Sequence, residues 1–267
     1  VNAVDDSTIS GTAGAAAISA NVGSGDSAQV GVGLGFSVVV NEVDADVDAI
    51  IAGSSILSGS SLTLGAETSA TVSGTAFGVS LALTQSQNAT AVSAAATGAL
   101  VFNTIDNDAR AEISDSADTG ATATLAGPVS ITAHDTSVIT ANAVAASLGL
   151  TISNSGTAVN GTIGVAYLDN SITNSARAAI NDIAVTTTAG GVSLDASSTA
   201  SITATGVSAS LGISSSSSGS SANFSADVSL AFNDIENTVE AVVENGAVVT
   251  SAGAVSLSAT DDTSITA

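Results

Sequence analysis

The stretch NEVDADVDAII, residues 41–51, decides how this chain is organised, because it returns three more times. The later copies are NTIDNDARAEI (103–113), NSITNSARAAI (170–180) and NDIENTVEAVV (233–243). Their first residues, Asn41, Asn103, Asn170 and Asn233, lie 62, 67 and 63 positions apart. Similarity at a fixed spacing is the signature of repeat architectures. We therefore expect residues 1–267 to form a single repeat array, with repeats at approximately 8–70, 71–137, 138–200 and 201–264.

A second marker supports the same period. It comprises Leu62-Thr-Leu, Val129-Ser-Ile, Val192-Ser-Leu and Val255-Ser-Leu, spaced 67, 63 and 63 residues apart. The longer spacing places about four extra residues in the loop around 114–127. DDSTIS from Asp5 also reappears as DDTSIT from Asp261, 256 residues or four periods of 64 later. The expected partners are therefore neighbouring repeats or further copies of the chain.

Alternating hydrophobicity predicts β-strands. In 224–232 the apolar residues occupy every second position, the pattern of a half-buried strand. From Asn233 the apolar set moves by one position, and the same change occurs after Asn41. We interpret both apolar sets as inward-facing and the change of phase as a corner or bulge.

The fold class expected from these patterns is all-β. Aromatic residues are only 2% of the chain, and Ala, Val and Gly dominate the predicted inner faces. Such small residues suit thin, closely packed sheets, so we expect a parallel β-solenoid of four tandem repeats, each forming two or three coils. The alternative is a string of small β-sandwich repeats, although sandwiches ordinarily have longer units and bulkier inner faces.

The charge excludes several classes of partner. With 24 acidic and two basic residues the net charge is −22, which excludes nucleic acid and repels anionic lipid. No stretch approaches the 18 or so apolar residues of a membrane-spanning helix, so we expect no membrane insertion in this segment. The absence of cysteine excludes a disulfide scaffold and thiolate metal sites.

Stacked repeats would bring equivalent side chains into ladders. We expect Asn41, Asn103, Asn170 and Asn233 to form an inward asparagine ladder, each amide bonded to the next; a turn-forming role for these asparagines is the alternative. Four positions further on, Asn107, Asn174 and Asn237 predict a partial second ladder, broken at Ala45. Seven positions after each marker the chain carries Asp48, Arg110, Arg177 and Glu240. We expect ion pairs between Arg110 and Asp48 and between Arg177 and Glu240, across neighbouring repeats.

Candidate chemical sites are few. The single histidine, His134, aligns with Glu67, Ser197 and Thr260 and is predicted to be a surface residue rather than part of a Ser-His-Asp site. The chain lacks lysine and cysteine, so we expect no enzyme activity. The acidic face following each marker predicts at most weak Ca²⁺ binding, at Asp44, Asp46, Asp106 and Asp108; a solvated acidic face without any cofactor is the alternative.

The marker pattern resembles the repeats of giant bacterial surface adhesins and large β-helical exoproteins of the filamentous-haemagglutinin-like and leukotoxin-like groups. It combines an apolar strand, Asn-x-Ile/Val-x-Asn/Asp, an acid-flanked Ala-x-Ile and then Val-Ser-Leu before polar turns. The resemblance implies a secreted, extracellular segment at the cell surface or in a biofilm matrix, acting as a fibre or adhesin stalk. A self-polymerising sheath or surface-layer filament subunit is the alternative. A polysaccharide-active β-helix enzyme is a third hypothesis, disfavoured by the shortage of aromatic and basic residues.

Overall fold

The computed structural model describes residues 1–115 and 119–267, which form thirteen β-strands in three parallel sheets. The first sheet contains, in spatial order, β1 (Asn2–Gly23), β4 (Leu62–Ser86), β7 (Val129–Ser153), β10 (Val192–Ser216) and β13 (Val255–Thr266). The second contains β2 (Gln29–Ala52), β5 (Ala91–Ser114), β8 (Ala158–Asn181) and β11 (Ser221–Glu244). The third contains the short strands β3 (Ile56–Gly59), β6 (Thr122–Leu125), β9 (Ala184–Thr187) and β12 (Val248–Ser251).

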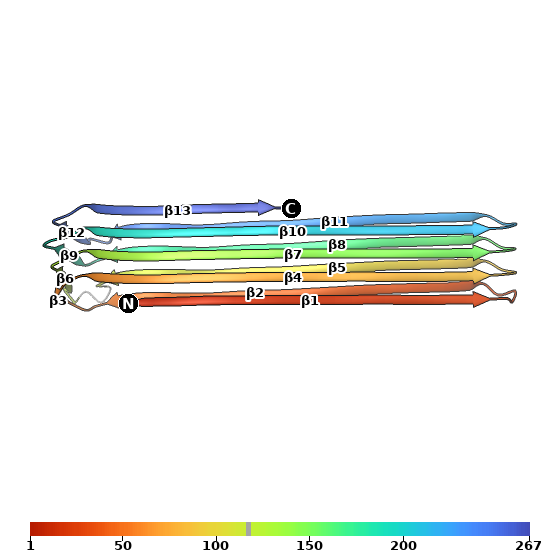
Figure 1. The fold of residues 1–267 in the computed structure, drawn as a ribbon, viewed down its shortest axis with the longest axis horizontal. Coiled ribbons are helices and arrows are strands. Elements are labelled where there is room, and N and C mark those ends of the chain that lie inside the picture. Colours follow the sequence, from red (N-terminus) through yellow and green to blue (C-terminus); the bar gives the residue numbers. More distant parts are fainter. Residues whose placement is uncertain (116–118) are drawn as a thin grey trace.

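The predicted fold class, an all-β parallel β-solenoid, is confirmed. The chain runs along the first sheet, turns, returns along the second sheet and passes through a short strand before the next coil begins (Figure 1). The prediction of two or three coils per repeat is wrong, because one repeat makes one coil. β2 and β4 have 24 and 25 residues, whereas ordinary strands have about five or six. Because the strands are so long, a single coil uses all the residues of one repeat.

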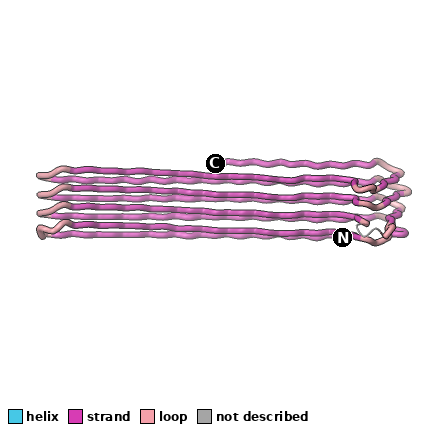
Figure 2. Tube along the Cα trace, turned by 180° about the vertical axis from the view of Figure 1, so that it is seen from behind, coloured by secondary structure: helices cyan, strands magenta, loops and turns pink. Residues whose placement is uncertain are grey.

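The molecule is therefore a flat slab, longest along its strands (Figures 1 and 2). At roughly 3.3 Å per residue, a 25-residue strand is about 80 Å long, whereas four coils at about 4.8 Å each stack to about 19 Å. The short strands close one end of the slab and tight turns such as 24–28 close the other. No helix in the described part of the chain is long and apolar enough to cross a membrane.

The stacking register matches the repeat spacing deduced from the sequence. Asn41 pairs with Asn103, Asn103 with Asn170 and Asn170 with Asn233. The second marker is likewise aligned from Leu62 to Val255. The longer second unit carries its extra residues between β5 and β6, where residues 115–121 replace the three-residue connection 53–55 of the first coil. Residues 116–118 of that loop lie outside the described part of the chain.

The change of hydrophobic phase at Asn41 is not a corner or a bulge. β2 continues through Asn41 without a shift of pairing, and its apolar residues before Asn41 point outward: Val32, Leu34, Phe36, Val38 and Val40 are each at least 50% exposed. The equivalent residues 224–232 of β11 occupy the same outward register. Their predicted inward orientation is therefore wrong. The apolar pattern moves from the outer to the inner surface of an uninterrupted strand.

Each coil consequently has two unlike halves. We call the part between the short strands and the asparagines the short-strand half; in β7 it spans 129–140. The turn half is the remainder, and in β7 it spans 141–153. The short-strand half has an aliphatic interior built around residues such as Leu64, Ile113, Ile131, Ile180 and Leu194. The turn half has mainly Gly, Ala, Ser and Thr inside, and apolar residues outside on both faces.

Candidate functional site

The predicted asparagine ladder is present at the boundary between the two halves. Asn41 Nδ2 donates to Asn103 Oδ1 (2.7 Å), Asn103 Nδ2 to Asn170 Oδ1 (2.8 Å), and Asn170 Nδ2 to Asn233 Oδ1 (2.8 Å). All four side chains point inward, and Asn103 is only 1% exposed. Gly74 faces this ladder, since a Cβ there would lie 2.7 Å from Asn103 Oδ1. The ladder thus links four coils through side chains, parallel to the backbone hydrogen bonds of the sheets.

The second set of asparagines does not form a ladder with itself. Asn107 and Asn174 donate to opposite oxygens of Asp135 on the facing sheet, at 3.2 and 2.6 Å, and Asn237 donates to Asp261 at 2.8 Å. The prediction of mutual bonds is therefore wrong. The reason is that a carboxylate across the interior is a stronger acceptor than the next amide.

Asp135 is the centre of a buried polar layer that sequence reasoning missed. Its carboxylate is 1% exposed. Besides the two asparagine amides it accepts hydrogen bonds from three hydroxyl groups: Thr68 (2.8 Å), Ser137 (3.0 Å) and Ser198 (3.1 Å). Five donors compensate for the water that the carboxylate loses on burial. The signal that could have found it is the alternation of acid and hydroxyl at one register position: Asp5, Thr68, Asp135, Ser198 and Asp261.

Only one of the two predicted ion pairs forms. Arg177 pairs with Glu240 of the next coil, and also with Glu244. Arg110 does not pair with Asp48, although the two are register partners; it binds Glu112 of its own strand instead, at 2.6 Å. Glu112 is only 1% exposed and Asp48 lies on the solvated face, so the guanidinium compensates the more strongly desolvated carboxylate. Burial alone would raise the pKa of Glu112, but its bonds to Arg110 and other donors lower it overall.

The acidic residues proposed for calcium lie together on the outer surface of the second sheet. Asp44 is the register partner of Asp106, and Asp46 that of Asp108. Burial raises the pKa of Asp108, and the nearby carboxylates of Asp46 and Asp48 raise it further. Within residues 1–115 and 119–267, no group of three or more Asp, Glu or His side chains is arranged to hold a metal ion.

His134 lies on the outer surface of β7, at the register position shared by Glu67, Ser197 and Thr260, as the alignment of repeats predicted. Its Nδ1 is 2.6 Å from Ser197 Oγ. Asp135, the next residue, points to the opposite side of the strand and is bound by the buried layer. The sequence-adjacent His-Asp pair is therefore divided between the two surfaces of the sheet, which separates it from any Ser-His-Asp geometry.

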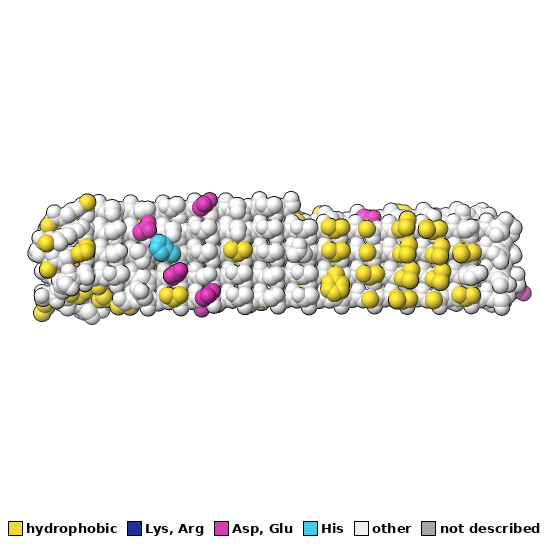
Figure 3. Space-filling view, viewed as in Figure 1, with side chains coloured by type: hydrophobic (Ala, Val, Ile, Leu, Met, Phe, Trp, Pro, Cys, Tyr) yellow, Lys and Arg dark blue, Asp and Glu magenta, His cyan; other side chains and the backbone are white. Residues whose placement is uncertain are grey.

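An apolar band covers both faces of the turn half. On the first sheet it consists of outward residues of four neighbouring strands, among them Ile18, Phe77, Leu148 and Leu211, each at least 40% exposed. Figure 3 shows this band as aligned rows, with His134 and most of the visible acidic side chains in the other half of the same face. On the second sheet the band includes Phe36, Phe224 and Phe232. Contiguous exposed apolar surface that crosses several neighbouring strands is typical of interaction sites.

The interior beneath this band is held by polar contacts between the sheets. Thr97 Oγ1 donates to Ser80 Oγ (2.7 Å), and Ser93 Oγ donates to the Ala82 carbonyl (3.0 Å). Asn160 Nδ2 donates to the Gly149 carbonyl at 2.6 Å, and a Cβ on Gly149 would lie only 2.1 Å from Asn160 Oδ1. The two sheets are therefore in close contact, and little interior space is left near the turns for large hydrophobic side chains.

Comparisons with known proteins assign no family to the chain: no family model, no curated protein and no solved structure matches it.

Proposed function

We propose that the chain is a structural repeat segment of an extracellular fibre or adhesin stalk, whose coils add to a longer stack and carry out no catalysis. The observation that carries the proposal is the continuity of the asparagine ladder and of the strand register. Asn41, Asn103, Asn170 and Asn233 connect all four coils, and equivalent residues are paired throughout the sheets. Each coil thereby presents the next with a matching set of donors and acceptors.

The outer strands of the stack support its extension. β1 and β2 lie at one edge of the two large sheets, and β13 and β11 at the other. Within the described residues their outer N–H and C=O groups have no strand partner, and such edges are templates for further strands. The next coil belongs either to the same chain or to another copy.

Each coil is much wider across the stack than it is tall along the stack. One repeat of about 64 residues adds only about 4.8 Å along the stack, while the strands extend about 80 Å across it. A thin stalk gains little length per residue in this way. The geometry therefore supports a second candidate, the self-polymerising sheath or surface-layer ribbon, in which width and stiffness are the useful properties.

Secretion to the cell surface or matrix is part of this proposal and rests on the resemblance of the repeat pattern to bacterial surface proteins. The net charge of −22 is consistent with a solvated ribbon. Calcium remains a secondary proposal, in which a cation would reduce repulsion between Asp44 and Asp106 and between Asp46 and Asp108 across the coils.

Electron microscopy with fibre diffraction of the concentrated protein tests the proposal. We expect ribbons about 80 Å wide that give a reflection near 4.8 Å along their length. The ribbons should lengthen as the protein concentration or the number of repeats increases. Particles that never extend beyond a single slab would contradict it. So would release of reducing ends from acidic polysaccharides incubated with the purified chain, because that activity would identify an enzyme.

A further inference from the structure

Two neighbouring rows of the apolar band on the first sheet are complementary in shape. The outward side chains of this band stand in rows that cross the coils. One row contains Ile18, Leu81, Leu148 and Leu211; the neighbouring row, two residues earlier, contains Ala16, Val79, Ala146 and Ala209. We call these the leucine row and the alanine row.

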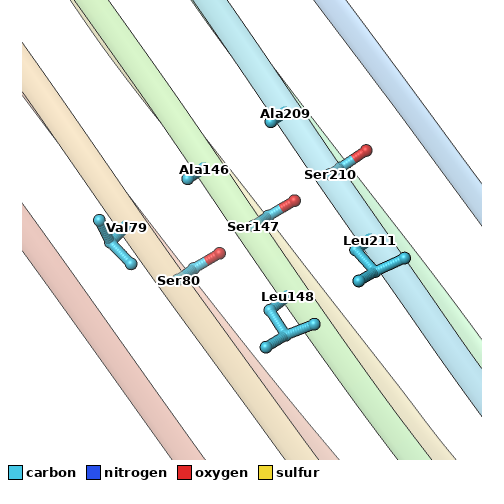
Figure 4. A pocket seen from close by; sticks show the side chains of 8 residues that line it. All are labelled: Val79, Ser80, Ala146, Ser147, Leu148, Ala209, Ser210 and Leu211. Atoms are coloured by element: carbon cyan, nitrogen blue, oxygen red, sulfur yellow. The ribbon is translucent and has the colours of Figure 1, made fainter.

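The two rows form a ridge beside a groove. A groove of about 290 Å³ has Ala146 and Ala209 as its floor, with Leu148 and Leu211 standing along one side and Val79 at one end (Figure 4). Ser80 and Ser147, between the rows in sequence, point to the interior and are at most 5% exposed. The groove is therefore lined at its surface by apolar groups.

We propose that this face binds the same face of a second copy of the chain, with the two stacks antiparallel in strand direction. A two-fold axis parallel to the stack, passing between the leucine and alanine rows, places each leucine row over the alanine row of the other copy. The contact is then isologous, meaning that each ridge enters the equivalent groove. Both copies have the same spacing between coils, so the rows match along the whole stack.

Charge selects the antiparallel arrangement. The outward acidic residues of the first sheet, Asp6, Glu67, Asp195 and Asp262, all lie in the short-strand half (Figure 3). The two-fold rotation moves the short-strand halves of the two copies to opposite ends of the dimer. The turns of each copy then lie over a row of hydroxyl groups on the other copy, which we call the hydroxyl row: Ser73, Thr140 and Thr203. Superposing the copies with parallel strands would instead bring the acidic residues face to face, which is unfavourable.

The contact area is sufficient for a stable dimer. From the hydroxyl row to the turn the overlap spans 14 residues, or roughly 46 Å at 3.3 Å per residue, across a stack about 19 Å high. Each copy thus covers about 900 Å², compared with about 800 Å² per partner in a standard interface. Every further coil would add about 220 Å² to that area.

Sedimentation equilibrium of paired variants tests the proposal. Leu148→Glu/Leu211→Glu alters the leucine row at residues that are 40% and 57% exposed. The control, Ile163→Glu/Val228→Glu, makes the same change on the opposite face at residues that are 43% and 41% exposed. At concentrations below those at which ribbons form, we expect a wild-type dimer whose Kd rises about 100-fold or more in the first variant and stays within about threefold in the control. Far-UV circular dichroism should show that both variants remain folded.

Cysteine pairing tests the orientation, because the chain has no cysteine of its own. The two-fold contact places Ala146 of one copy opposite Leu148 of the other. Mixed Ala146→Cys and Leu148→Cys chains should therefore form a disulfide-linked dimer faster than either variant alone. A wild-type chain that stays monomeric at its highest soluble concentration would overturn the proposal, as would a dimer lost in the control instead. Binding to phosphatidylcholine vesicles in place of dimerisation would also overturn it.

The proposal is independent of stacking along the strand edges. Edge stacking produces open-ended ribbons and leaves the leucine row exposed, so it persists in Leu148→Glu/Leu211→Glu. Loss of ribbons with retention of the face-to-face dimer, or the reverse, would therefore show which of the two contacts fails.

Discussion

Replacing Asn103 with alanine removes the centre of the asparagine ladder. The side chain is 1% exposed; it accepts a bond from Asn41 at 2.7 Å and donates one to Asn170 at 2.8 Å. Each bond contributes about 1 kcal/mol, and a buried acceptor left without a donor costs about a further 1–3 kcal/mol. Asn41 keeps the Ser73 carbonyl as an acceptor at 3.3 Å, so only Asn170 Oδ1 loses its partner. We expect the free energy of unfolding to fall by about 3–5 kcal/mol.

Urea unfolding followed by far-UV circular dichroism measures this loss. Asn233→Ala is the matched control, since Asn233 is partly exposed and accepts a single ladder bond, at 2.8 Å. We expect it to lose about 1–2 kcal/mol, with the dependence on urea unchanged in both variants. A loss below about 1 kcal/mol for Asn103→Ala, or a loss equal to that of Asn233→Ala, would refute the view that the ladder stabilises the stack.

Four further predictions concern the interior and the charged side chains. Asp135→Ala should destabilise the chain by about 3–5 kcal/mol, because five donors lose their acceptor, whereas Asp261→Ala at the same register position in the last coil should cost less than about 1 kcal/mol; equal losses in urea titrations would contradict the role of the buried layer. Gly149→Val should cost about 2–3 kcal/mol through its clash with Asn160, and Asn160→Ala in the same chain should restore part of the melting temperature; no restoration would place the strain elsewhere. Glu112 has a lowered pKa, so its ionised form stabilises the fold above its ordinary pKa of 4.5, and this contribution is lost as the pH falls through the folded value; Glu112→Gln should therefore destabilise the chain at pH 7 and progressively less below about pH 4.5. Asp108 has a raised pKa, so its ionisation opposes folding above its ordinary value of 3.8, and Asp108→Asn should raise the melting temperature at pH 7; a pH profile with either sign reversed would refute the assignment.

The repeat was predictable from the sequence because stacking in register requires equivalent residues at equal spacing. The positions of Asn41, Asn103, Asn170 and Asn233 therefore gave both the parallel pairing and the first ladder. The number of coils per repeat was not predictable in the same way. It depends on strand length, and the glycines of β2, at 31, 33 and 35, weaken a strand locally without ending this one.

The orientation of the apolar residues was the main error, and its cause is physical. Alternation identifies the two faces of a strand but does not say which of them is inside. The sequence pattern predicts an inward orientation for Val32, Leu34, Phe36, Val38 and Val40 because apolar residues are normally buried. The deciding information lies across the interior, where Gly33 has the Leu81 carbonyl oxygen 2.8 Å from the position of a Cβ. The close contact of the two sheets excludes large side chains there. The pairing of Arg110 was missed for a related reason, since Glu112 is buried only in the folded coil.

A disulfide placed between consecutive coils would test whether one repeat makes one coil. Ser130 and Ser193 are register partners on the outer surface of β7 and β10, 63 residues apart. Adjacent strands lie about 4.8 Å apart, within the Cα separation that a disulfide spans. In this otherwise cysteine-free chain, Ser130→Cys/Ser193→Cys should oxidise to an intramolecular disulfide, while Ser130→Cys/Ser201→Cys, offset by eight residues, should not. If the first pair stays reduced under conditions that oxidise other neighbouring cysteines, equivalent residues are two or three coils apart and the single-coil repeat is wrong.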